Sequence, residues 1–294
     1  MPPVVKRRKP IQVQLAKVYE GQSLEGAYIA EPKYDGLRGV IVFKGCKGEA
    51  LTRTGLPIPN AKHVIDELAK TGNFFNQVLD GEFLADDWNL SQSIVKTQEP
   101  HPEAEKLKFY VFDIIPLESW VAKAETHPLW FRKEELERRV GKFKFTLNTP
   151  STPMCRTPEE ISKTLVAYTT VGFEGIMLKD LDAPYQYKKS ATWLKVKPIH
   201  EADFFITGAT EGRGKHKGKL GALFIMNEEL ALPNGETGVE CEVGTGFSDA
   251  QREELWADFK ADKLIGRCVE VEYQEVTEDG ALRFPAFKRM RDDK

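Results

Sequence analysis

The chain has 294 residues, of which 41% are hydrophobic and 30% are charged, and its formal net charge is −3 at pH 7. This composition is typical of a globular protein with one large domain or two ordinary ones. No apolar run approaches the ~20 residues of a membrane-spanning helix, and no apolar stretch follows the basic N-terminus. We therefore expect a cytoplasmic protein without a membrane partner. The four cysteines form no C-x-x-C pair, which argues against a zinc ribbon or a disulfide framework.

Charge is distributed unevenly along the chain. Residues 201–294 hold 13 basic and 20 acidic side chains, a net charge of −7, whereas residues 1–200 hold 29 and 25, a net charge of +4. The basic groups are clustered within each part. The small net charge of the whole chain therefore does not exclude a nucleic-acid partner.

The first 200 residues mix strand and helix patterns. Residues 1–27 are predicted to form a loose, partly extended lead-in. Strands are predicted at 28–30, 37–43, 77–84, 109–115, 175–178 and 193–196, and helices at 61–70 and 131–140. Thr157 suits the N-cap and Pro158 the first turn of a further helix. We expect an α+β domain over residues 1–200.

Short strands dominate after residue 200. They are predicted at 204–208, 222–226, 239–243, 268–276 and 282–287, with one helix at 249–259. Five strands and one helix in under a hundred residues favour a small β-barrel of the OB type over residues 201–294. A hinge is expected near residues 198–201, where the pattern changes.

The segment Glu31-Pro32-Lys33-Tyr34-Asp35-Gly36-Leu37-Arg38 contains K-x-D-G-x-R. A lysine can act as a covalent nucleophile only in its neutral form. At the reference pKa of lysine, about 10.4, roughly one side chain in a thousand is neutral near pH 7.4. Nearby cations would favour that form. The same composition also suits an ordinary surface turn, so the motif alone does not establish an enzyme.

Further motifs follow in order along the chain. They are Arg53-Thr54-Gly55, Leu79-Asp80-Gly81-Glu82-Phe83, Phe109-Tyr110-Val111-Phe112-Asp113, FEGIMLK at 173–179, WLKVKP at 193–198, and a tail over 283–294 that ends in R-x-D-K. Together with the lysine motif, they resemble the covalent nucleotidyltransferases and, within them, the small phage-type ATP-dependent DNA ligases. The resemblance extends from about residue 28 to residue 294, and seven ordered elements do not arise by chance.

The resemblance implies a nucleotidyltransferase (adenylation) domain of antiparallel sheets flanked by helices, followed by an OB-fold barrel. It also implies a three-step reaction. Lys33 takes AMP from ATP and releases pyrophosphate, AMP passes to the 5′-phosphate of a nick, and the 3′-hydroxyl closes the phosphodiester while AMP leaves. The implied cofactors are ATP, as AMP donor, and Mg²⁺ or Mn²⁺. The implied partner is nicked double-stranded DNA, bound by a monomeric protein.

The resemblance further implies roles around the nucleotide. Lys195 and Lys197 alternate along a strand and so share a face, where they would hold the α-phosphate. The ring of Phe112 would stack on the adenine. Glu31, two residues before Lys33, would accept a hydrogen bond from the adenine amine, and this favours ATP over GTP because guanine offers an oxygen there.

The remaining implied contacts are to a divalent cation, to the nucleotide and its phosphates, and to pyrophosphate. A divalent cation is expected at Glu174 and Glu82, with Glu82 also near the ribose. Arg38, Arg53 and Lys179 are expected at the nucleotide or its phosphates, and the two arginines also approach the nick. For Asp80, a role in stabilising the turn beside Gly81 stays open. The pyrophosphate would be oriented by Arg291, Asp293 and Lys294.

A glycine-rich basic loop lies within the acidic second part. Arg213, Lys215, Lys217 and Lys219 fall within seven residues, and such a cluster suits a phosphate backbone. It resembles the loop between the first barrel strands of small ligases. We expect it to grip duplex DNA opposite the nick, and a solvated mobile loop is the alternative.

Three other functions remain open at this point. An RNA ligase acting on nicked RNA often lacks the barrel and its R-x-D-K tail. A GTP-dependent capping guanylyltransferase is disfavoured by Glu31. A non-enzymatic OB-type nucleic-acid-binding protein would have no use for Lys33, Lys195 and Lys197 together. No separate DNA-binding domain is expected before residue 28, so the two domains and their loops would have to complete any ring around DNA.

Overall fold

The computed structural model describes residues 11–150, 152–277 and 279–291. The chain divides into two compact units, Met1–Lys197 and Pro198–Lys294. The boundary predicted from the sequence, after residue 200, lies three residues from this division. The description below takes each unit by itself.

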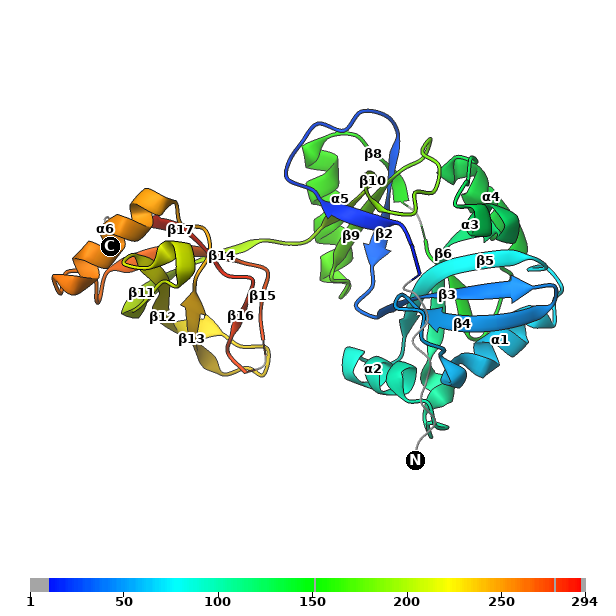
Figure 1. The fold of residues 1–294 in the computed structure, drawn as a ribbon, viewed down its shortest axis with the longest axis horizontal. Coiled ribbons are helices and arrows are strands. Elements are labelled where there is room, and N and C mark those ends of the chain that lie inside the picture. The colour runs from blue at the N-terminus through cyan, green and yellow to red at the C-terminus, as the bar shows by residue number, and fades with distance from the viewer. Residues whose placement is uncertain (1–10, 151, 278, 292–294) are drawn as a thin grey trace. The chain divides into compact units, whose positions relative to one another are not determined.

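Unit 1 contains two five-stranded sheets, which are seen in the right half of Figure 1. The first has the order β4-β3-β5-β6-β7, and only the β6–β7 pair is parallel. The second has the order β1-β10-β9-β2-β8, and only the β1–β10 pair is parallel. The strands are β1 (Leu15–Val18), β2 (Tyr28–Lys33), β3 (Leu37–Lys44), β4 (Lys47–Thr52), β5 (Gln77–Leu84), β6 (Lys108–Pro116), β7 (Thr146–Asn148), β8 (Thr152–Cys155), β9 (Gly175–Asp180) and β10 (Lys189–Val196).

The helices of unit 1 pack against these sheets, with α1 to α4 contacting the first sheet and α5 the second. They are α1 (Lys62–Ala69), α2 (Trp88–Lys96), α3 (Leu117–Ala122), α4 (Leu129–Arg139) and α5 (Pro158–Thr170), with short 3₁₀ turns at Pro59–Ala61 and Ala104–Lys106. The α5 helix begins as the sequence predicts, because the Thr157 side chain accepts a hydrogen bond from the Glu160 backbone N–H in a capping box. Among the described residues, no helix is long and apolar enough to cross a membrane.

A buried apolar cluster joins the inner faces of the two sheets. It includes Val40 of β3, Phe112 of β6 and Trp193 of β10, and the rings of Phe112 and Trp193 meet edge to face at 5.8 Å. A separate core lies between the first sheet and helices α1 and α2, where Phe43 and Phe83 are buried. The first sheet therefore has apolar contacts on both faces. Burial of both faces specifies the pairing register of its strands.

Within the described residues, the lead-in predicted over residues 1–27 as loose and partly extended contains one strand that the sequence analysis did not predict. Residues Leu15–Val18 form β1, an edge strand that pairs in parallel with β10. The pairing partners, Lys189 to Lys195, are far away in sequence, so a local pattern of four residues does not indicate the strand. The sequence prediction also missed β4, β7, β8, α2 and α3.

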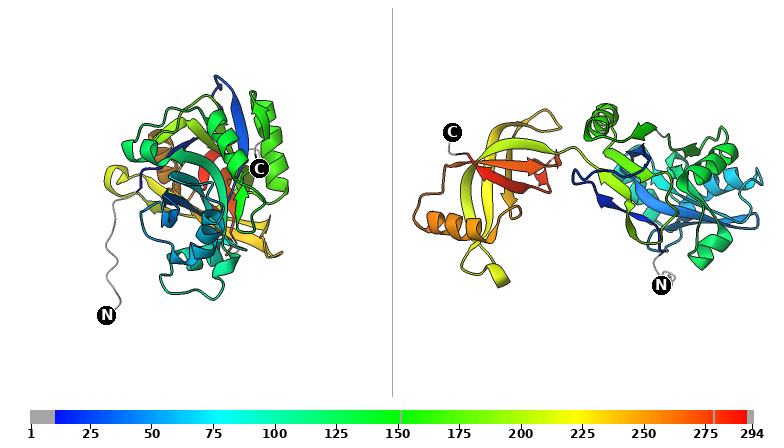
Figure 2. Two further views of the ribbon diagram at one scale, coloured as in Figure 1. Left: turned by 90° about the vertical axis from the view of Figure 1, so that its right-hand side faces the viewer. Right: turned by 90° about the horizontal axis from the view of Figure 1, so that it is seen from above.

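Unit 2 is built on one antiparallel sheet of the order β13-β12-β11-β14-β17. Its strands are β11 (His200–Glu211), β12 (Leu220–Ala231), β13 (Thr237–Val243), β14 (Cys268–Tyr273) and β17 (Ala286–Met290), with helix α6 (Asp249–Lys260) and a two-stranded ribbon of β15 (Glu275–Val276) and β16 (Leu282–Arg283). The sheet curls around a core that includes Phe204, Leu223 and Val271. Figure 2 shows this curvature.

The two edges of this sheet approach each other without a strand ladder between β13 and β17 in the described part of the chain. The backbone N–H of Phe287 donates to the Thr245 carbonyl at 2.9 Å, and the Thr245 hydroxyl donates to the Pro285 carbonyl at 2.7 Å. These bonds join the segment after β13 to the start of β17. The strand order and the helix between the third and fourth strands agree with the OB-type unit that the sequence predicts.

Candidate active site

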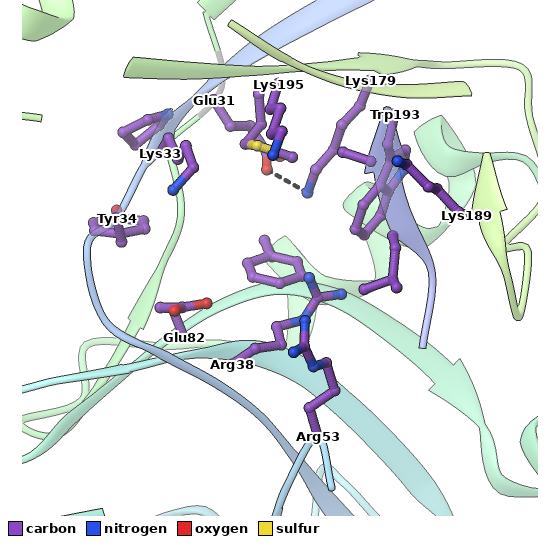
Figure 3. Close-up of a pocket in the computed structure, with 15 residues that line it drawn as sticks. Glu31, Lys33, Tyr34, Arg38, Arg53, Glu82, Lys179, Lys189, Trp193 and Lys195 are labelled. Atoms are coloured by element: carbon purple, nitrogen blue, oxygen red, sulfur yellow. Dashed lines mark ion pairs between the residues drawn. The ribbon is translucent and has the colours of Figure 1, made fainter. Parts of the chain in front are cut away.

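A cavity of about 390 Å³ lies in unit 1 and is lined by residues of both sheets. The second sheet contributes Lys33 from β2 and Lys195 from β10, and the first contributes Arg38 from β3, Glu82 from β5 and Phe112 from β6. Figure 3 shows these charged side chains converging from opposite sides of the cavity. The site thus depends on how the two sheets pack.

Lys33 lies at the end of β2 and is ion-paired to Glu174, whose other carboxylate oxygen is ion-paired to Lys197. The backbone holds this arrangement, because the Glu174 N–H donates to the Lys33 carbonyl at 3.2 Å. At Gly175, a Cβ atom would lie 2.2 Å from the Val196 carbonyl oxygen, so only glycine allows β9 and β10 to approach so closely. Burial raises the pKa of Glu174, but Lys197 and Lys33 outweigh burial and the pKa is lowered.

Lys195 adds a further cation to the same wall. Burial lowers its pKa, and the neighbouring charges of Lys197 and Lys33 lower it further. Lys189, exposed at the other end of β10, also lines the cavity. A row of cations beside one carboxylate is an arrangement that suits a polyphosphate.

Arg38 is held by a bidentate ion pair with Asp80, with distances of 2.6 Å from Nε to Oδ1 and from Nη2 to Oδ2. Asp80 is completely buried and also accepts a hydrogen bond from the Tyr185 hydroxyl at 2.5 Å. Asp80 therefore does not stabilise a turn: it lies within β5 and orients Arg38. The guanidinium lies 4.5 Å from the centre of the Phe112 ring, so these contacts fix its position over that ring.

Glu31 is 1% exposed, and its two carboxylate oxygens are ion-paired to Lys133 and Lys179. The Lys179 ammonium is 2.6 Å from Glu31 and 4.1 Å from the ring centres of both Phe112 and Trp193. Burial lowers the pKa of Lys179 to about 8, although Glu31 opposes the shift. A hydrogen bond from adenine to Glu31 stays a prediction, and it would have to share the carboxylate with these lysines.

Three more residues that line the cavity, Glu82, Arg53 and Tyr34, differ in their exposure and in their contacts. Glu82 is half-buried, and burial raises its pKa to about 7 despite the nearby charges of Arg38 and Lys33. Arg53 is exposed, and its backbone N–H donates to the Arg38 carbonyl at 3.2 Å. Tyr34 follows Lys33, and its ring packs 4.4 Å from that of Tyr110.

In the part of the chain that the structure describes, no group of three or more His, Cys, Asp or Glu side chains could hold a metal ion. Mg²⁺ usually keeps several waters and binds through one or two carboxylates plus substrate phosphates. Glu82 lines the cavity and Glu174 is ion-paired to Lys33, which also lines it, so the two carboxylates fit a cation that arrives with a nucleotide. They do not form an all-protein cage.

The candidate residues of unit 2 fall into two groups. Arg213, Lys215 and Lys217 are exposed in the β11–β12 connection, whereas Lys219 is ion-paired to Glu253 at 2.6 Å. Arg291 is ion-paired to Asp203 of β11, with Nη1 2.9 Å from Oδ1. The other two pyrophosphate candidates, Asp293 and Lys294, lie outside the described residues.

Sequence reasoning missed several residues that line the cavity or contact residues that line it. Lys133 comes from α4, and its charged helix gave no sign of contact with Glu31. Gln14, from the lead-in, accepts a hydrogen bond from Arg38 at its backbone carbonyl at 3.3 Å. Trp193 lies within a motif that the sequence analysis used, but its ring contact with Lys179 was not expected.

The fold and the site together define a nucleotidyltransferase-type unit joined to an OB-type unit. Residues 4–197 match the family model described as "ATP dependent DNA ligase domain", and residues 211–291 match the model described as "DNA ligase OB-like domain". The chain therefore belongs to the ATP-dependent DNA ligase family.

Individual relatives agree with this assignment. Proteins named DNA ligase from Archaeoglobus fulgidus and Methanosphaera stadtmanae are 31% and 28% identical to the chain over 97% of its length. The chain spans 56% of the length of each of these relatives.

Solved structures give the same result. One described as "Pmar-Lig_Pre" is 26% identical with a TM-score of 0.78, covering 96% of this chain and 68% of its own. A structure from a study of Lig E DNA ligases described as "DNA binding with a minimal scaffold" is 25% identical with a TM-score of 0.66, covering 95% of this chain and 98% of its own. The fold is shared with a bacteriophage ATP-dependent DNA ligase in complex with ATP, at 21% identity and a TM-score of 0.58. That alignment covers 96% of this chain and 99% of the phage chain.

Proposed function

We propose that the chain is an ATP-dependent DNA ligase that seals 3′-hydroxyl/5′-phosphate nicks in duplex DNA through a lysyl-AMP intermediate and a DNA-adenylate. The observation that carries this proposal is Lys33, which lines the cavity and is ion-paired to Glu174, which is in turn ion-paired to Lys197. It combines an amine nucleophile with cations that can neutralise a phosphate and a carboxylate suited to a divalent cation.

The first step joins Lys33 to the nucleotide. The Lys33 ammonium gives up one proton to solvent, its Nζ then forms a bond to the α-phosphorus while the bond to pyrophosphate breaks, and the second proton leaves to solvent as the phosphoramidate forms. Glu174 is proposed to hold the amine in place before attack, and Lys195 and Lys197 are proposed to neutralise the charge that develops on the α-phosphate. Catalysis of this kind depends mainly on positioning and charge neutralisation.

The nucleotide would lie between the two sheets, with its adenine against Phe112 and its ribose near Glu82. Arg38 is oriented by Asp80 and would contact the ribose or a phosphate, together with Arg53. Glu174 and Glu82 would hold Mg²⁺ or Mn²⁺, which when bound neutralises phosphate charge. Arg291, with Asp293 and Lys294, is proposed to orient the pyrophosphate.

The later steps transfer AMP to the 5′-phosphate at the nick and then join the strands. The exposed cations Arg213, Lys215 and Lys217, with Lys219, are proposed to bind the phosphate backbone of the duplex. The cytoplasmic location and the monomeric state stay predictions.

The test is covalent labelling. The protein is incubated with Mg²⁺ and ATP, GTP or NAD carrying a label on the transferred nucleotide, then denatured, and the retained label is measured. We expect label from ATP alone, its loss in Lys33→Ala, and its retention in the control Lys44→Ala, which removes an exposed lysine at the end of β3. Label from GTP would instead favour a capping-type enzyme, and no label from any donor would refute catalysis.

A second measurement separates the nucleic-acid substrates. Nicked DNA and nicked RNA of one sequence are compared for sealing by the adenylated protein. Sealing of nicked DNA is expected. A preference for nicked RNA would replace the DNA ligase proposal with an RNA ligase.

A further inference from the structure

The basic loop of residues 212–219 between β11 and β12 adopts a defined conformation in unit 2. It contains a 3₁₀ turn at Gly214–His216, and its ends are tied because the Gly212 N–H donates to the Lys219 carbonyl at 2.9 Å. The Gly218 N–H donates to Oε1 of Glu211 at 2.8 Å. At Gly212, a Cβ atom would lie 2.5 Å from the His216 carbonyl oxygen, so the tight turn requires glycine there.

Helix α6 lies beside this loop (Figures 1 and 2). Asp249 and Glu253 of the helix contact the loop itself, and Arg252 contacts the two residues that follow it. Asp249 lies 3.8 Å from Nδ1 of His216, and Glu253 lies 2.6 Å from the Lys219 ammonium. Arg252, which precedes Glu253 in the sequence, is buried. A capping box of Ser248 and Gln251 fixes the start of the helix, so these side chains come from a well-anchored first turn.

Arg252 ties the loop exit to the rest of the sheet. Its Nη1 donates to the carbonyls of Leu220 and Gly221, both at 2.9 Å, and its Nη2 donates to the Gly244 carbonyl at 2.7 Å. One guanidinium thus satisfies three backbone acceptors from the segments after the loop and after β13. A lysine could not reproduce this fork of donors.

The Lys219–Glu253 pair also changes the charge that the loop presents to a phosphate. Arg213, Lys215 and Lys217 are exposed, but Lys219 has its charge balanced by a carboxylate on α6. Glu253 also raises the pKa of the Lys219 ammonium. Lys219 can contact a phosphate only in competition with this carboxylate, and the carboxylate itself repels DNA.

We infer that α6 sets the affinity of the basic loop for duplex DNA. Arg252 positions the loop, and Glu253 restrains Lys219 and thereby weakens DNA binding. The inference rests on the proposed function, because it assumes that the loop binds the phosphate backbone. Glu253 acts through Lys219 and Arg252 acts through the backbone, so both are positioning residues.

The test compares Glu253→Gln with Glu254→Gln. Glu254 is the next residue of α6, is exposed, and has no hydrogen bond or ion pair with Lys219, so both variants change net charge equally. The dissociation constant for a nicked duplex is measured at several salt concentrations. We expect Glu253→Gln to bind about threefold more tightly than Glu254→Gln, because surface pairs contribute at most about 1 kcal/mol. Its salt dependence should be steeper by up to about one phosphate contact.

A double-mutant cycle makes the result specific. In a Lys219→Gln background, Glu253→Gln should change affinity no more than Glu254→Gln does. Arg252→Lys should weaken DNA binding while lysyl-AMP formation stays at the wild-type level. Equal affinities for Glu253→Gln and Glu254→Gln would overturn the inference. If the wild-type protein did not bind nicked DNA at all, the proposed function itself would fail, so the two failures are distinguishable.

Discussion

Lys33 is ion-paired to Glu174 at the wall of a cavity between two sheets, and the same carboxylate is ion-paired to Lys197. A single side chain therefore organises both the proposed nucleophile and one of the cations proposed for the α-phosphate. This relationship gives the most direct prediction for catalysis.

Glu174→Gln should slow lysyl-AMP formation by at least about 100-fold, because the amide keeps the shape but loses the charge that pairs both lysines and suits a divalent cation. Single-turnover labelling with ATP and Mg²⁺ measures the rate. Glu137→Gln, at an exposed position of α4, is the matched control and should behave as wild type. A Glu174→Gln rate within a few-fold of wild type would contradict this role.

The ion pair between half-buried Arg38 and buried Asp80 should contribute strongly to stability. Asp80→Asn leaves the guanidinium without its bidentate partner and should lower the free energy of unfolding by about 3 kcal/mol. Urea denaturation of the nucleotide-free protein measures the loss. Asp66→Asn, on the exposed face of α1, should change stability by less than about 0.5 kcal/mol. A loss below about 1 kcal/mol for Asp80→Asn would show that the pair does not hold Arg38 in solution.

The raised pKa of Glu82 should make the stability of the folded protein depend on pH. Burial raises its pKa from 4.5 to about 7, so between these values the unfolded chain is ionised while the folded protein keeps its proton. Stability therefore falls as pH rises through this window, by at most about 3 kcal/mol. Below pH 4.5 the penalty is absent, and above about pH 7 it is fully present.

Glu82→Gln removes this penalty. The variant should match wild type near pH 4.5 and exceed it in stability at pH 8, in urea unfolding without nucleotide. Glu99→Gln, at an exposed position, is the control. A stability difference between wild type and Glu82→Gln that is the same at both pH values would exclude the titration of Glu82 as its cause.

Substitution of the exposed loop cations should weaken DNA binding without changing lysyl-AMP formation. Replacing Arg213, Lys215 and Lys217 with glutamine should reduce the salt slope of DNA binding by about 2.7, at about 0.9 per phosphate contact. Lysyl-AMP formation should be unchanged, because these side chains are assigned to the phosphate backbone of the duplex and not to the nucleotide. Lys260→Gln and Lys263→Gln, at exposed positions in and after α6, provide the control. A normal affinity for nicked DNA in the triple variant would place the DNA elsewhere.

The sequence was sufficient for much of the fold and for the main candidate residues. The β5 strand was predicted with its observed bounds, Gln77–Leu84, in which apolar Val78, Leu79, Phe83 and Leu84 flank a polar centre. The α5 cap at Thr157 was predicted because a capping box is a local signal. The ordered motifs around Lys33 and Glu174 indicated the family, which the family models confirm.

The amino-acid sequence by itself determined which chemical groups are present and in what order, because capping, strand alternation and motif spacing are all local properties. Only the tertiary structure decided that β1 completes the second sheet, that Asp80 orients Arg38, and that Lys133 reaches Glu31. The physical reason is that each of these contacts joins segments distant in sequence. Their energies depend on burial and on charge pairs that exist only once the two sheets have packed.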